Sequence, residues 1–246
     1  LMAVMAKYPE LTLVTNAKTV AILSQFFETN FEGRVLNVTD GGTLSLGEHE
    51  LTFVFAPMVH WPEVMVSYES SEKVLFSADG FGKFGALSVA DDEWDCEARR
   101  YYMNIVGKYG AQVQNLLKKA ATLEIKTIAP LHGPILCGDL SHYINQYDIW
   151  SSYRPETEGV FIAYASIYGN TAKAAHALAN LLRDKGVKVA ITDLARDDRA
   201  EALEDAFRYS RMVLASSTYD GGIFTPMRDF ILDLEHKGYR NRRVGL

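Results

Sequence analysis

Apolar residues in the first part of the chain recur at spacings that alternate between those of strands and those of helices. Alternating apolar and polar positions predict short strands over residues 11–14, 34–38, 43–55 with a break near Gly47, 64–68, 74–77 and 127–131. Helical spacing predicts helices over residues 1–8, 19–29 with Thr19 as the cap, 92–121 with interruptions near Gly107 and Gly110, and 140–150. We therefore expect a mixed α/β domain here.

The pattern becomes a regular alternation of strands and helices after a polar segment, 151–159, which contains Pro155 and Gly159 and is the best candidate for a linker. Apolar runs predict strands over 160–165, 188–192, 212–216 and a strand that begins at Val244. Helical runs between them predict helices over 172–184, 200–207 and 226–236. Strands separated by helices indicate a parallel, doubly wound sheet.

Composition narrows the class of protein. The 246 residues are enough for two domains, and a hydrophobic content of 48% with 23% charged residues is typical of a globular protein. A net charge of −6 offers no basic face, so we expect no nucleic-acid partner and no membrane partner. No apolar run is long enough to span a bilayer. Cys96 and Cys137 lack metal-binding spacing, which favours a reducing, cytoplasmic location.

A hydroxyl-rich turn follows the strand over 160–165 and precedes a helix. Backbone N–H groups and hydroxyls at such a turn can hold a phosphate, assisted by the helix dipole. The turn contains no Lys or Arg, and neither an ATP-type P-loop nor a dinucleotide G-x-G-x-x-G is present. A neutral cradle suits the single phosphomonoester of FMN, whereas the plainer alternative is an ordinary helix cap. The predicted phosphate-binding residues are Ser166, Ile167, Tyr168, Gly169, Asn170 and Thr171.

A second loop follows the strand over 212–216, at the same predicted edge of the sheet. Tyr219 offers an aromatic face for a flavin ring, and Asp220 with Gly221 lets the backbone turn close to it. Thr218 begins this loop. An Asp-Gly turn alone would be an unremarkable loop, so the prediction depends on its position beside the phosphate-binding turn.

Three polar side chains each follow a different apolar strand in the first part of the chain: His60, Asp79 and His132. If these strands end at a common edge, two imidazoles and a carboxylate converge, a ligand set that favours Zn, Fe or Mn. Each residue alone is more simply a hydrogen-bonded loop residue. The remaining histidines are expected to be structural: His49, His142, His176 and His236.

These motifs together resemble the flavodiiron proteins, or A-type flavoproteins, over nearly the whole chain. The matching segments are His60-Trp61-Pro62, residues 77–82, residues 131–134 and residues 164–171. The resemblance implies a partial metallo-β-lactamase-like αββα sandwich followed by a partial flavodoxin-like doubly wound parallel sheet. The expected domains are residues 1–153, the diiron domain, and 158–246, the FMN-binding domain.

The resemblance also implies a chemistry. In this family the residue matching Asp79 bridges two non-haem Fe ions, and those matching His60 and His132 bind one iron each. Electrons pass from FMN to the diiron site, which reduces O2 to water, NO to N2O, or both. The implied donor is rubredoxin or a similar electron carrier. The implied assembly is a head-to-tail homodimer, in which the flavin of one subunit faces the irons of the other.

Two departures from the family pattern leave alternatives open. No H-x-E-x-D-type motif precedes His60, and the second flavin-ring loop, expected after the strand at Val244, is absent. The chain looks cut at both ends, so we expect it to bind iron and FMN poorly and to show negligible reductase activity alone. The alternatives are a zinc hydrolase of the metallo-β-lactamase type with a flavodoxin-like appendage, and a non-catalytic FMN electron carrier.

Overall fold

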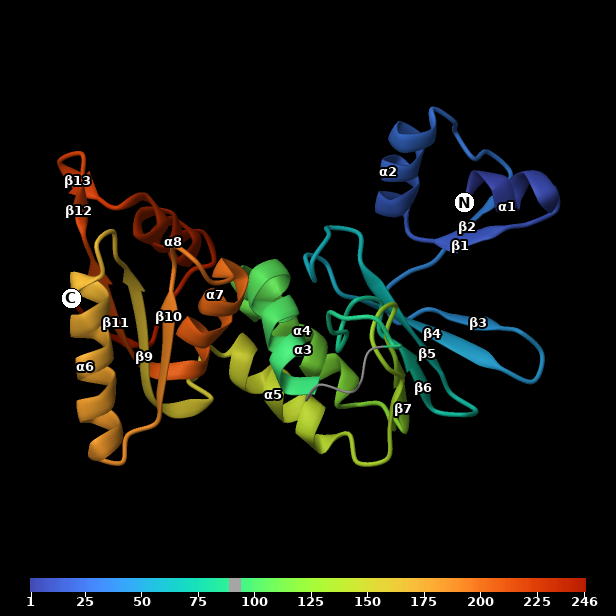
Figure 1. Cartoon of the computed structure of the whole chain (residues 1–246). Helices are drawn as coiled ribbons and strands as arrows, with labels where there is room; N and C mark the ends of the chain where they lie inside the picture. The colour runs from blue at the N-terminus through green and yellow to red at the C-terminus, as the bar shows by residue number, and fades with distance from the viewer. Residues whose placement is uncertain (89–93) are drawn as a thin grey trace. The chain divides into compact units, whose positions relative to one another are not determined.

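The computed structural model describes residues 1–88 and 94–246 and divides the chain into two compact units (Figure 1). Unit 1 comprises Leu1–Gly82 and Gln112–Leu140, and unit 2 comprises Lys83–Ala111 and Ser141–Leu246. These units are defined by packing, and the domain limits 1–153 and 158–246 stay a prediction. Among the described residues, no helix is long and apolar enough to cross a membrane.

Unit 1 is built on a six-stranded mixed sheet and a separate pair of parallel strands. The six-stranded sheet has the order β3 (Thr43–Ser45), β4 (Glu50–Phe55), β5 (Met65–Glu69), β6 (Val74–Phe76), β7 (Thr127–Ala129) and β8 (Leu136–Cys137). The parallel pair is β1 (Leu13–Thr15) and β2 (Val35–Asn37). The unit also contains α1 (Met2–Lys7) and α2 (Ala17–Phe27). These elements match the predicted ones except β8, which has only two residues and is too short to show an alternation of apolar and polar positions.

Strand direction in this sheet decides where the candidate ligands lie. Strands β4 and β5 are antiparallel, β5 and β6 are antiparallel, and β6 and β7 are parallel. Strands β4, β6 and β7 therefore run in the same direction, and their carboxyl ends meet at one edge of the sheet. His60, Asp79 and His132 each follow one of these three strands.

The predicted cap of the helix after β1 was wrong. Helix α2 begins at Ala17, and its cap is Asn16, whose Oδ1 accepts a hydrogen bond from the Thr19 backbone N–H at 3.1 Å. Asn16 also donates from Nδ2 to the Glu63 carbonyl at 2.8 Å. Thr19 therefore contributes the donor of the cap rather than the acceptor, because the helix begins two residues earlier than its pattern suggested.

The long helical zone changes its helix type at both predicted interruptions, Gly107 and Gly110. Helix α3 (Trp94–Tyr101) passes into a π-helical turn, η1 (Tyr102–Val106), a 3-10 turn, η2 (Gly107–Tyr109), and α4 (Gly110–Ala120). The predicted start at Asp92 lies outside the described residues. A Cβ at Gly110 would lie 2.3 Å from the Ser151 carbonyl oxygen. This glycine, at which α4 begins, therefore also permits close packing on the end of α5 (Ser141–Ser151).

Unit 2 contains a parallel sheet with the strand order β10 (Val189–Asp193), β9 (Thr157–Ala165), β11 (Tyr209–Ser216) and β14 (Arg243–Gly245). Helix α6 (Asn170–Asp184) covers one face, where Ile162 packs with Ala175 and Ala179. On the other face lie α7 (Arg199–Arg208) and α8 (Thr225–His236) (Figure 1). Phe161 there meets Phe230 edge to face. Helices on both faces confirm the doubly wound α/β fold.

The segment predicted as a linker is instead built into unit 2. Residues 157–159 belong to β9, and the Glu156 carboxylate is largely buried. Glu156 accepts hydrogen bonds from Arg99 Nε and Nη2, each at 2.7 Å, and one from Trp150 Nε1 at 2.9 Å. The polar segment 151–159 thus contributes a carboxylate to a buried ionic contact and is not a free linker.

Candidate functional site

Both candidate metal-binding histidines lie against the same carboxylate in unit 1. His60 Nε2 is 3.3 Å from Asp79 Oδ2, and His132 Nε2 is 3.9 Å from Asp79 Oδ1. Each imidazole thus faces its own oxygen of Asp79. All three side chains keep about a quarter to a third of their surface exposed, so an ion could reach them from solvent.

The backbone around Asp79 forms a tight, hydrogen-bonded turn. The buried Ser77 hydroxyl donates to the Gly80 carbonyl at 2.6 Å, and the Gly80 N–H donates to the Ser77 carbonyl at 2.9 Å. Ala78 and Phe81 have positive φ angles of 52° and 65°. Non-glycine residues in this left-handed conformation are concentrated at functional sites, where the surrounding structure holds them.

The position of the His132 ring depends on the absence of a side chain at Gly82. A Cβ at Gly82 would lie 2.4 Å from His132 Cε1 and 2.8 Å from its Nε2, closer than atoms can approach. The residues present therefore suit a metal ion in two respects, the donor set and the space left for one imidazole.

Each histidine lies beside Asp79, and the three side chains do not form a complete set of metal ligands. Among residues 1–88 and 94–246, no group of three or more His, Cys, Asp and Glu side chains has the arrangement of a metal site. The metal assignment of His60, Asp79 and His132 therefore stays a prediction. Three other histidines have structural contacts: His49 with Glu69, His142 with Asp95 and His176 with Tyr164.

The predicted phosphate-binding turn lies at the carboxyl end of β9, before the N-terminus of α6. Gly169 occupies the cap position with φ of 86°, and no side chain caps the helix. The Ser166 hydroxyl is buried and accepts a hydrogen bond from the Gly169 N–H at 3.0 Å. An uncapped helix N-terminus with hydroxyls beside it is a suitable site for an anion.

Ser217, which the sequence reasoning did not select, joins this turn from the neighbouring strand. Its Oγ lies 3.1 Å from Thr171 Oγ1 and accepts a hydrogen bond from the Ile167 N–H at 3.4 Å. Strand β11 pairs with β9, so Ser217 follows a strand that ends beside Ser166. The available signal was the Ser-Ser-Thr sequence at this strand end, combined with strand adjacency.

The predicted ring-binding loop forms a small hairpin of β12 (Thr218–Tyr219) and β13 (Gly222–Ile223). Asp220 and Gly221 make its turn with positive φ angles of 49° and 71°. Tyr219 is 56% exposed, and its ring centroid is 5.8 Å from that of Phe224. Tyr168 of the phosphate-binding turn is 91% exposed. Both tyrosines are therefore accessible to a planar ligand.

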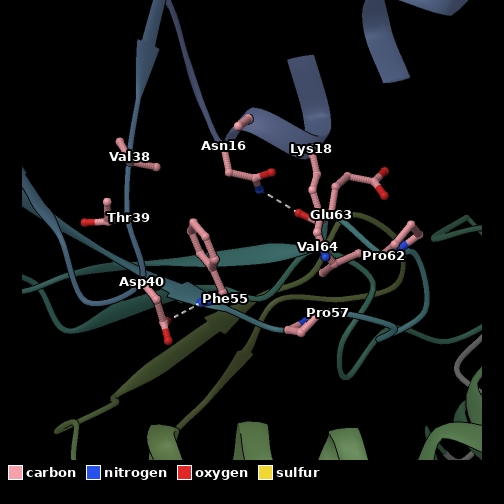
Figure 2. Close-up of a pocket in the computed structure, with 11 residues that line it drawn as sticks. Asn16, Lys18, Val38, Thr39, Asp40, Phe55, Pro57, Pro62, Glu63 and Val64 are labelled. Atoms are coloured by element: carbon pink, nitrogen blue, oxygen red, sulfur yellow. Dashed lines mark hydrogen bonds between the residues drawn. The ribbon is translucent and has the colours of Figure 1, made fainter. Parts of the chain in front are cut away.

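A separate pocket of about 420 Å³ lies in unit 1 (Figure 2). The loop that carries His60 contributes Pro57, Pro62 and Glu63 to its wall, but none of the three candidate ligands lines it. The Phe55 ring projects into it, and the Phe55 N–H donates to Asp40 Oδ1 at 2.8 Å (Figure 2). Although partial burial opposes the shift, hydrogen bonds from Lys119 and Phe55 lower the pKa of Asp40. These contacts identify a structural polar network.

Comparison with known proteins places both units in one class, a β-lactamase-type fold combined with a flavodoxin. The model of the ODP family beta lactamase matches residues 1–133, and that of flavodoxin matches residues 162–243. The chain is 34% identical over 220 residues to the nitric oxide reductase of Moorella thermoacetica, covering 85% of this chain and 54% of that protein.

Solved structures show the same combination. The rubredoxin oxygen:oxidoreductase of Desulfovibrio gigas aligns with a TM-score of 0.86 and 27% identity, over 95% of this chain and 60% of that one. The flavodiiron protein of Giardia intestinalis aligns with a TM-score of 0.84 and 27% identity, over 92% of this chain and 57% of that one. The chain belongs to the ODP family beta lactamases, and its combination of this domain with a flavodoxin is that of the flavodiiron proteins. It spans just over half the length of the first curated relatives it matches.

Proposed function

We propose that this chain is part of a flavodiiron oxidoreductase that passes electrons from FMN to a non-haem diiron site and reduces O2 to water, NO to N2O, or both. The observation that carries the proposal is the presence, in one chain, of two separate sites of complementary chemistry. Unit 1 brings two imidazoles to one carboxylate, and unit 2 places hydroxyls at an uncapped helix N-terminus. A hydrolytic metal centre needs no electron supply, whereas a redox metal centre does.

The residues have distinct roles in this proposal. His60, Asp79 and His132 would hold the two iron ions, with Asp79 as the carboxylate that lies beside both imidazoles. Ser166, Thr171 and Ser217, with the backbone N–H groups at the start of α6, would hold the FMN phosphate. Tyr219 would lie against the flavin ring, and the Asp220-Gly221 turn would let backbone groups approach its polar edge. When bound, FMN and iron together supply electron transfer to the gaseous substrate.

The names of the relatives support the choice of substrates and donor. One is a nitric oxide reductase, and another is a rubredoxin oxygen:oxidoreductase. We therefore propose O2 or NO as substrate and a rubredoxin-type protein as donor. A head-to-tail homodimer and a cytoplasmic location complete the proposal. The exposed Tyr168 and Tyr219 rings are compatible with a second protein surface closing over the flavin.

A single-turnover experiment tests the proposal. The chain is loaded anaerobically with FMN and excess Fe²⁺, the flavin is reduced, and its reoxidation by O2 or NO is followed by absorbance. Iron should accelerate reoxidation in the wild-type chain and not in Asp79→Asn, which removes the shared carboxylate. Single turnover is used because a site with three identified ligands is expected to sustain little steady-state activity. Equal rates with and without iron, at iron and FMN occupancies verified by metal analysis and flavin absorbance, would contradict the proposal. Zinc-dependent hydrolysis independent of flavin would favour the hydrolase instead.

A further inference from the structure

We propose that Gly82 is a positioning residue for His132, whose imidazole can face Asp79 only while position 82 carries no side chain. This inference deepens the proposed function, because it concerns the same metal site. It assigns a role to a residue that donates no ligand. The carrying observation is the distance of 2.4 Å between a Cβ at position 82 and His132 Cε1.

Position 82 needs a glycine because a side chain would occupy the space of the His132 ring, and not because of its backbone conformation. The φ angle of Gly82 lies outside the left-handed region, in contrast to the neighbouring Phe81 with φ of 65°. An alanine could therefore adopt the backbone conformation of Gly82 without strain. Its methyl group would instead meet three atoms of the His132 ring at 2.4–2.8 Å.

The backbone on both sides of this contact is anchored. The Gly82 N–H donates to the Asp79 carbonyl at 3.1 Å, and the Leu131 N–H donates to the Ala78 carbonyl at 2.8 Å. The first bond holds position 82 to the turn that carries Asp79. The second holds the residue before His132 to the same turn. Rotation of the His132 side chain is therefore the least costly way to relieve the clash.

Such a rotation would change the contact of His132 with Asp79 and not that of His60. His60 lies beside the other oxygen of Asp79, and the three atoms nearest to a Cβ at position 82 all belong to His132. A side chain at position 82 should displace His132 from Asp79 and leave the His60–Asp79 pair in place. Loss of a residue that orients a metal ligand typically weakens metal binding roughly 10–100-fold.

Nuclear magnetic resonance of the histidine ring protons tests this directly. The chain has six histidines, and each Hε1 signal is assigned by substitution to Gln. Without metal, the wild-type spectrum should show a nuclear Overhauser contact between His132 Hε1 and the Gly82 Hα protons. Gly82→Ala should shift the His132 signal and leave those of the other five histidines unchanged, which also shows that the variant is folded.

Titration with Mn²⁺ supplies the second measurement. In the wild-type chain the His60 and His132 signals should broaden together. In Gly82→Ala the His132 signal should need roughly 10–100-fold more Mn²⁺ to broaden. Gly107→Ala is the matched control, because its Cβ would lie no closer than 3.7 Å to its neighbours and its backbone is helical.

The outcomes separate this inference from the proposed function. An unchanged His132 shift with unchanged Mn²⁺ broadening in Gly82→Ala would overturn the role of Gly82. If Mn²⁺ broadens neither His60 nor His132 in the wild-type chain, the proposed metal site fails. The role of Gly82 is then decided by the metal-free shift and the Overhauser contact alone.

Discussion

Arg99 donates two parallel hydrogen bonds to the Glu156 carboxylate, from Nε to Oε2 and from Nη2 to Oε1, each 2.7 Å long. Its remaining Nη1 donates to Glu204 Oε2 at 2.6 Å. One buried guanidinium thus joins helix α3, the segment before β9 and helix α7. Arg99 and Glu204 are each 2% exposed, so water does not solvate their charges. Each charge is therefore stabilised by its buried partner.

Arg99→Met should lower the free energy of unfolding of unit 2 by about 3–5 kcal/mol, because it leaves two buried carboxylates without their cation. The measurement is urea unfolding followed by tryptophan fluorescence, since Trp94 and Trp150 stack at 5.8 Å between ring centroids within this unit. Arg100→Met is the control. Arg100 pairs with the partly exposed Asp198, so its loss should cost less than about 1 kcal/mol. Equal costs for the two variants would show that the buried network does not stabilise the unit.

The same network should make stability depend on pH. Burial raises the pKa of Glu204 from 4.5 to about 7, with Arg99 opposing the shift. The folded state therefore holds this proton more tightly than the unfolded state. The resulting stabilisation is fully present below pH 4.5 and is lost as pH rises through about 7. Asp205, whose pKa burial raises to about 6, acts in the same direction.

Glu204→Gln should flatten the fall in melting temperature between pH 5 and 8, as an amide stays neutral across this range. Glu201→Gln at an exposed position of α7 should change the profile much less, because Glu201 is only a lesser cause of the raised pKa of Asp205. Melting temperatures from circular dichroism at several pH values provide the comparison. A Glu204→Gln profile that parallels the wild type would refute the assignment of this pH dependence to Glu204.

Ser217→Ala should weaken FMN binding about tenfold or more, because a hydrogen bond to a charged group contributes roughly 1.5–3 kcal/mol. Riboflavin, which lacks the phosphate, should bind the variant and the wild type equally. Fluorescence quenching titrations measure both affinities. Ser216→Ala is the neighbouring control, since the Ser216 hydroxyl donates to the Ser217 carbonyl at 3.1 Å. A similar loss for riboflavin would place Ser217 at the ring or in the fold instead of at the phosphate.

Asn16→Ala should destabilise unit 1 by about 1–2 kcal/mol, because it removes a helix cap and the hydrogen bond to the Glu63 carbonyl. Thr19→Ala retains the backbone N–H that Asn16 accepts and should change stability by at most about 0.5 kcal/mol. Hydrogen exchange of the α2 amides, compared between these variants, distinguishes them. A larger effect of Thr19→Ala would restore Thr19 as the important residue.

The sequence predicted the parallel sheet of unit 2 well, because apolar strands such as Val160–Ala165 are buried on both faces and separated by clear helices. It also predicted that His60, Asp79 and His132 lie at one edge, and this was possible because each follows an apolar strand. Ser217 could not be selected without knowing that β11 lies beside β9. The role of Gly82 depends on a contact with a residue fifty positions away, and local patterns carry no signal of such contacts.

The segment before β9 was misread for a related reason. Pro155 and the polar residues around it have the composition of a tether, but Glu156 finds its partner on α3, far away in sequence. The π-helical turn η1 was equally hidden, although Gly107 and Gly110 do mark the two ends of the interruption that follows it, where the 3-10 turn η2 begins and where α4 begins. At Gly110 the absence of a side chain also permits close packing against the Ser151 carbonyl.

The contact between Gly82 and His132 has a consequence for how related sequences diverge. A glycine that serves only as space is released from constraint once the imidazole it accommodates is gone, so positions 82 and 132 should change together. A homologue that keeps a histidine at the second position but carries a bulky residue at the first would pass a search for ligand residues. Its ring would nevertheless point elsewhere, and counting metal ligands by residue type would overestimate how many such homologues bind metal.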